Sequence, residues 1–236
     1  MNTKWSSAAA ITISGLLVAS AASAQQRDER QNAGDTSDSL APATHSVELT
    51  VGTGYAQGFG KIASAQPSLT DIGQAGGAVQ VGVGYRIIPQ LTLGVYGAGA
   101  MFGRGDQVDP SANLSSAAAG VQADWHFLPG GHQLDPWVSL GSGWRGYWNH
   151  ADQGTTSLQG LELAKLQIGL DYRIDQAIAI SPVIGADLST FFTQSTPTAT
   201  AFTNISSPNV NTFVFAGLQG RFDVPTGGES SKVASR

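Results

Sequence analysis

The chain has 236 residues, of which 12% are charged and 30 are glycine, and its formal net charge at pH 7 is −5. An ordinary soluble domain carries roughly 25% charged residues, so side chains that could coat a wet surface are scarce here. The mild charge and the lack of a basic cluster exclude a nucleic-acid-binding protein. Cysteine is absent, so we expect neither disulfides nor a lipoprotein anchor.

Residues 1–24 have the features of an export signal. Lys4 precedes an apolar stretch over about residues 8–18, and the segment closes on the small residues Ala22-Ser23-Ala24. This pattern predicts a cleaved Sec-type signal peptide rather than a membrane helix. No other run approaches the roughly 18 consecutive apolar residues that a spanning helix needs.

Residues 25–44 are polar and aperiodic, and we expect them to form a flexible periplasmic segment of the mature chain. From His45 onward, apolar and polar side chains alternate in eight successive stretches. A period of two predicts β-strands, because successive side chains point to opposite faces. The predicted strands cover about residues 45–56, 76–88, 90–102, 115–127, 137–148, 161–174, 177–190 and 211–224.

The lengths of the strands and of their connections favour a membrane barrel over a soluble sandwich. Globular strands average about 5–6 residues, whereas a tilted membrane strand needs about 9–11. The connections alternate between long ones, at residues 57–75, 103–114, 149–160 and 191–210, and shorter ones, at 88–90, 128–136 and 175–176. Such alternation is typical of outer-membrane barrels. The face with Val79, Val81 and Val83 is therefore predicted to contact lipid. A secreted β-sandwich is the alternative, and recovery in the soluble periplasm would favour it.

The last predicted strand, Asn211–Val224, resembles the C-terminal signal read by the barrel-assembly machinery. It contains Gly217 and the aromatic Phe222, although Gly220 stands where a hydrophobic residue is usual and residues 225–236 follow as a tail. Over residues 45–224 the chain resembles small bacterial outer-membrane barrels of the OmpX, OmpW and OmpA-barrel type.

This resemblance implies an all-β fold, an eight-stranded antiparallel up-and-down transmembrane β-barrel. It also implies a monomer in the outer membrane of a Gram-negative bacterium, in contact with outer-membrane lipid and lipopolysaccharide. Both ends of the barrel, and the tail of residues 225–236, would then lie in the periplasm.

The side chains opposite the lipid face include charged residues in equal numbers of each sign, which predicts an interior network of paired charges. Since the first strand pairs with the second and closes against the last, Glu48 is expected near Arg86 or Arg221. Asp187 is expected to face Lys165. The ten predicted interior charges are Glu48, Arg86, Asp124, Arg145, Lys165, Asp171, Arg173, Asp187, Arg221 and Asp223.

Many glycines share this inward face, and they either let the sheet curl around bulky interior groups or leave a narrow water-filled path.

The sequence contains no recognisable catalytic, cofactor-binding or metal-binding motif. His126 and Asp124 share the inward face, which favours a structural contact. We therefore expect a non-enzymatic envelope scaffold with four exposed loops and no cofactor. A narrow pore for small solutes is the alternative, and a lipid-modifying enzyme is a weaker third.

Overall fold

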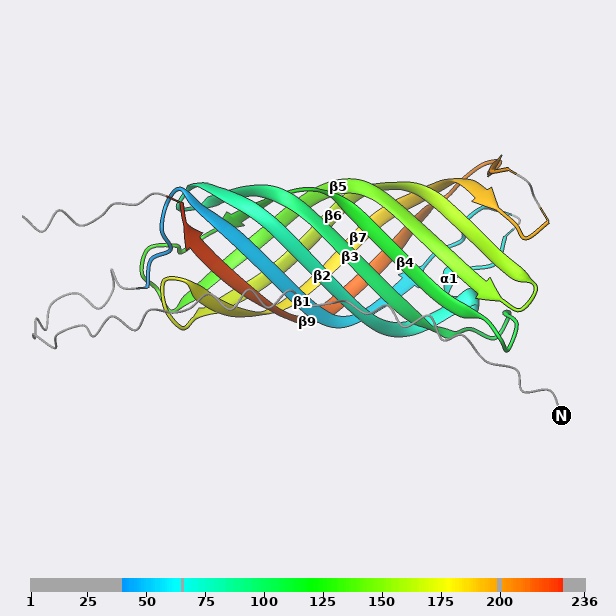
Figure 1. Ribbon diagram of the computed structural model, residues 1–236, viewed down its shortest axis with the longest axis horizontal. Coiled ribbons are helices and arrows are strands. Elements are labelled where there is room, and N and C mark those ends of the chain that lie inside the picture. Colours follow the sequence, from blue (N-terminus) through cyan, green and yellow to red (C-terminus); the bar gives the residue numbers. More distant parts are fainter. Residues whose placement is uncertain (1–39, 65, 199–200, 227–236) are drawn as a thin grey trace, which may run out of the picture. The chain divides into compact units, whose positions relative to one another are not determined.

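The computed structural model describes residues 40–64, 66–198 and 201–226. The expected signal peptide, residues 25–39 and residues 227–236 lie outside this part of the chain. Eight long strands close into an antiparallel barrel (Figure 1). Each strand pairs with its neighbours in the chain, and β1 also pairs with β9, the last strand. The barrel strands are β1 (Ser46–Phe59), β2 (Gly73–Ile88), β3 (Leu91–Arg104), β4 (Asn113–His126), β5 (Leu134–Ala151), β6 (Gly154–Arg173), β7 (Ile178–Ser195) and β9 (Val210–Pro225). The predicted fold class is confirmed.

The connections differ at the two ends of the barrel (Figure 1). Short turns and both ends of the described chain lie at one end, which we call the short-turn end. Long connections lie at the other, the long-loop end. They contain the helix α1 (Leu69–Ile72) and the two-residue strand β8 (Thr203–Asn204). In the described residues, no helix is long and apolar enough to cross a membrane.

The barrel is apolar outside and charged inside. Val79, Val81 and Val83 are 45%, 55% and 51% exposed. Gln80, which lies between two of these valines, and Arg86, further along the same strand, are buried. Large exposed apolar side chains occur on the outward faces of all eight barrel strands. An exterior of this kind suits hydrocarbon and not water, so the predicted direction of the valine face is confirmed.

One of the four predicted long connections is wrong. Strands β5 and β6 continue outward as a paired hairpin, with His150 opposite Thr155, and only Asp152 and Gln153 connect them. Gly154 has a φ of +124°, a conformation that glycine adopts without a steric penalty. The polar residues of this segment resemble a loop in composition. However, polar β-branched residues also pair well in a strand that faces water.

A β-bulge in β6 changes which residues face inward. The pairing of β6 with β7 shifts between Glu162 and Ala164. Leu163 and Ala164 are consecutive and both exposed, whereas Glu162 is buried. A shift of one residue exchanges the two faces of a strand. The alternation of the residues after the bulge, extended back to Glu162, therefore assigns Glu162 to the outward face, which is wrong.

Inward glycines allow close approach rather than leaving open space. A Cβ on Gly54 would lie 2.2 Å from the carbonyl oxygen of Ala216 on the neighbouring strand, and a Cβ on Gly169 would lie 2.5 Å from the Trp137 ring. These contacts agree with the first interpretation of the glycines, in which they let a narrow sheet curl around bulky interior groups.

Candidate functional site: the interior of the barrel

Six charged side chains form an ion-pair cluster at the short-turn end. Glu48 accepts from Arg86 at 2.6 Å and also from Arg221. Asp223 accepts from Arg86 at 3.2 Å and from Arg173 at 3.1 Å. Arg221 Nε lies 3.0 Å from Asp171 Oδ2. All six side chains are buried. We refer to Glu48, Arg86, Asp171, Arg173, Arg221 and Asp223 as the short-turn cluster.

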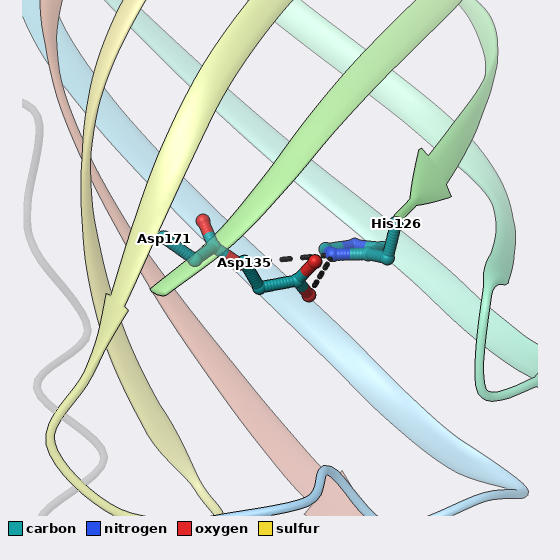
Figure 2. Close-up of side chains that lie close together, drawn as sticks. All are labelled: His126, Asp135 and Asp171. Carbon is teal, nitrogen blue, oxygen red and sulfur yellow. Dashed lines mark hydrogen bonds and ion pairs between the residues drawn. The ribbon is translucent and has the colours of Figure 1, made fainter. Parts of the chain in front are cut away.

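His126 lies beside this cluster, and the carboxylates of Asp135 and Asp171 both lie on the same side of its ring, as Figure 2 shows. Its Nδ1 lies 2.8 Å from Asp135 Oδ2 and 3.9 Å from Asp171 Oδ2, and all three side chains are 0% exposed. Asp124, which shares an inward face with His126, instead accepts from Gln122 at 3.1 Å. Asp135 was not predicted as an interior charge, because β5 begins at Leu134, three residues before the predicted start.

A second charged group occupies the middle of the barrel. Glu162 accepts from the Tyr96 hydroxyl at 2.5 Å and from Arg145 Nε at 3.0 Å. Arg145 also donates to Asp187 at 2.6 Å. Lys165 stands opposite Asp187 in the strand register, as expected, but the ion pair of Asp187 is made with Arg145.

Lys165 and three glutamine side chains cross the lumen next to this group. The Lys165 ammonium lies 3.7 Å from the centroid of the Tyr96 ring, a cation–π contact. Gln167 donates to Gln80 at 2.9 Å, and Gln80 donates to Gln219 at 2.9 Å. These three glutamines come from β6, β2 and β9, and we call them the glutamine layer.

The free space beside the glutamine layer is small, whereas a cavity of about 290 Å³ borders Ile62, Tyr147 and Leu158 at the long-loop end. Two cavities, of about 40 and about 10 Å³, both border Gln80, Tyr96, Lys165 and Gln167. Since one water needs roughly 10–15 Å³, the smaller cavity has space for about one molecule.

A cluster of buried apolar side chains occupies part of the lumen at the long-loop end. Two connections fold inward, bringing Ile62 and Leu69 from the β1–β2 connection and Ile205 from the β7–β9 connection. A capping box between Ser68 and Asp71 holds α1, which carries Leu69. The apolar plug consists of Ile62, Ala63, Leu69, Leu114, Tyr147, Leu158, Phe191, Ile205 and Phe213.

No protein-family model matches this chain, and no curated protein is similar to it in sequence. Solved structures share its fold. Neisserial surface protein A superposes with a TM-score of 0.50 and 14% identity, covering 75% of this chain and 96% of that one. The chain has the fold of the small outer-membrane β-barrels. The N-terminal barrel domain of Pseudomonas aeruginosa OprF gives a TM-score of 0.45 at 16% identity, over 76% of this chain and 98% of that one. AlkL in lipid bilayers gives 0.48 at 10% identity, over 84% and 99%.

Within this small outer-membrane-type barrel, nine of the ten predicted interior charges are buried and Asp187 is half-buried. Glu48 contacts both arginines named for it. The predicted charge sum of zero is wrong, because Glu162 and Asp135 also face inward. In the described residues, seven interior carboxylates face five lysine and arginine side chains, a formal sum of −2 with His126 neutral.

Proposed function

We propose that the protein is a non-enzymatic outer-membrane barrel of a Gram-negative bacterium, exported through the Sec pathway, that serves as a scaffold for its long-loop end. The observation that carries this proposal is that packed side chains obstruct the lumen at three successive levels. The short-turn cluster, the glutamine layer and the apolar plug each place contacting side chains from several strands in the interior. An interior packed in this way supports rigidity, and eight strands leave room for little besides side chains.

Single-channel recording in a planar bilayer tests the scaffold proposal. The protein is purified from membranes, and folding is verified by a gel band that shifts on boiling. A scaffold gives no discrete conductance steps after verified insertion. Steps of uniform size would contradict it and would favour the pore.

A narrow pore is the second candidate, because several buried polar atoms in the lumen lack a hydrogen-bond partner among the described residues. They include Arg86 Nε, Asp124 Oδ1 and Arg221 Nη2. Buried polar atoms without protein partners bind ordered water. Separate water molecules would therefore lie at intervals along the lumen. Conduction would require movement of the glutamine layer and of the apolar plug, and the same recording would detect it.

The proposed partners are outer-membrane lipid, lipopolysaccharide and, during insertion, the barrel-assembly machinery; the protein is proposed to act as a monomer. The outward-facing Phe222 of β9 supports recognition of the last strand. Phe222→Ala is expected to lower the amount of heat-modifiable barrel in the outer membrane. Leu218→Ala, on the same face of β9, is the control.

The proposed absence of enzymatic activity is tested by the mass of lipid A, which deletion of the gene should leave unchanged.

A further inference from the structure

We propose that His126, Asp135 and Asp171 bind a divalent transition-metal ion, for which Zn²⁺ is the best match. The three residues come from three adjacent strands, since His126 ends β4, Asp135 is the second residue of β5 and Asp171 lies near the end of β6 (Figure 2). A bound ion would therefore tie the short-turn ends of these strands together.

The donor atoms have a spacing close to that of a zinc site. One nitrogen and two carboxylate oxygens all lie within 4.8 Å of one another. His126 Nδ1 is 2.8 Å from Asp135 Oδ2 and 3.9 Å from Asp171 Oδ2. Tetrahedral zinc with bonds of about 2.0–2.1 Å places its ligands about 3.3 Å apart. The two distances fall on either side of this value and all three donors lie within 4.8 Å of one another, so movements of about 0.5 to 1.5 Å would bring the donors into place.

The second oxygen of each carboxylate is already held by the protein. Asp135 Oδ1 accepts from the backbone N–H of Leu128 at 2.9 Å, and Asp171 Oδ1 accepts from the Ser181 hydroxyl. Both Oδ2 atoms are thereby directed toward His126. Hydrogen bonds of this kind orient the ligands of protein metal sites.

Asp171 Oδ2 is a metal-ligand candidate that still has lone pairs free to accept a bond. Its side chain is 0% exposed, and the oxygen accepts no well-aligned hydrogen bond in the described part of the chain. Arg221 Nε faces it at 3.0 Å as an ion pair, but the same guanidinium also donates to Glu48. This buried oxygen lies 3.9 Å from His126 Nδ1, so one metal ion could bind both atoms.

The charge balance at this end supports a cation independently of the distances. Five buried carboxylates, Glu48, Asp124, Asp135, Asp171 and Asp223, accompany three arginines, Arg86, Arg173 and Arg221. Uncompensated buried charge is costly, and a divalent ion would cancel the excess of two. Imidazole together with carboxylate favours zinc over magnesium or calcium, which prefer oxygen ligands. The fourth position would take a water molecule.

Metal analysis of the membrane-purified protein tests the proposal. Because the site is fully buried, the ion is expected to enter during folding, so cells are grown with and without added Zn²⁺. After treatment with a chelator, the folded protein should retain about one zinc ion per chain. His126→Gln and Asp171→Asn should lose it. His150→Gln, at an exposed histidine far along β5 from Asp135, should retain it.

A second measurement requires no variant and therefore does not depend on variants that fold. X-ray absorption of the zinc-loaded wild-type protein should show oxygen and nitrogen neighbours, including one imidazole. A folded wild-type barrel that holds no zinc after growth in added Zn²⁺ would overturn the proposal, as would full retention by His126→Gln.

Discussion

Glu48 and Asp223 stand opposite each other where β1 pairs with β9, so two carboxylates meet at the closing seam of the barrel. Like charges directly opposite destabilise a strand pair. Arg86 donates to both of them and is itself 0% exposed. The seam therefore depends on an arginine from β2, one strand away.

We expect Arg86→Met to destabilise the barrel by about 3–5 kcal/mol, because it leaves two buried carboxylates without their shared partner. The measurement is urea unfolding in lipid vesicles, followed by the heat-modifiable band. Arg104→Met, at an exposed arginine at the end of β3, should change the stability little. Equal stability of the two variants would show that the seam does not need Arg86.

Phe213→Ala should loosen the apolar plug. The Phe213 ring packs edge-on against Phe191 and lies 4.3 Å under the Arg145 guanidinium. Removing a buried aromatic ring costs about 3–5 kcal/mol in unfolding experiments. Val214→Ala changes the next residue, which is exposed on the outward face, and should cost less. If the two variants unfold at the same urea concentration, the plug contributes little.

Gly169→Ala should destabilise the barrel by about 1–3 kcal/mol, since the added methyl group overlaps the Trp137 ring. Gly77→Ala is the matched control. At Gly77 nothing lies within 4 Å of an added Cβ, so its stability should be unchanged or slightly higher. The same unfolding assay compares the two, and a neutral Gly169→Ala would argue that the Trp137 ring moves aside freely.

The β3–β4 connection should loosen at low pH. The backbone N–H and hydroxyl of Ser111 both donate to Asp109 and lower the pKa of its carboxyl. The resulting stabilisation is present above the ordinary carboxyl pKa and is lost as the pH falls through the lowered value.

The Ser111 hydroxyl oxygen also accepts from the Asp152 backbone N–H at 3.1 Å, so hydrogen exchange at Asp152 is the measurement for this prediction. Asp109→Asn should raise the exchange rate at neutral pH and weaken its change with pH. Asp106→Asn, in the same connection, should behave as the wild type. An exchange rate at Asp152 that Asp109→Asn leaves unaltered would contradict the prediction.

The eight strands, their order and the direction of the valine face follow from the sequence alone. Alternation is a local property, and side chains such as Val79, Val81 and Val83 share a face in any extended strand. The contact of Glu48 with Arg86 and Arg221 was also predictable, since closure of an up-and-down barrel brings the first strand between the second and the last.

Only the tertiary structure decided the position of Glu162, because a bulge adds one residue to β6 and exchanges the faces of the strand beyond it. Only the tertiary structure could bring together His126, Asp135 and Asp171. These residues occupy three strands and have no characteristic spacing in the chain, and their distances depend on the register between neighbours. Alternation is encoded within each strand, whereas the contacts across the lumen depend on how all eight strands are aligned.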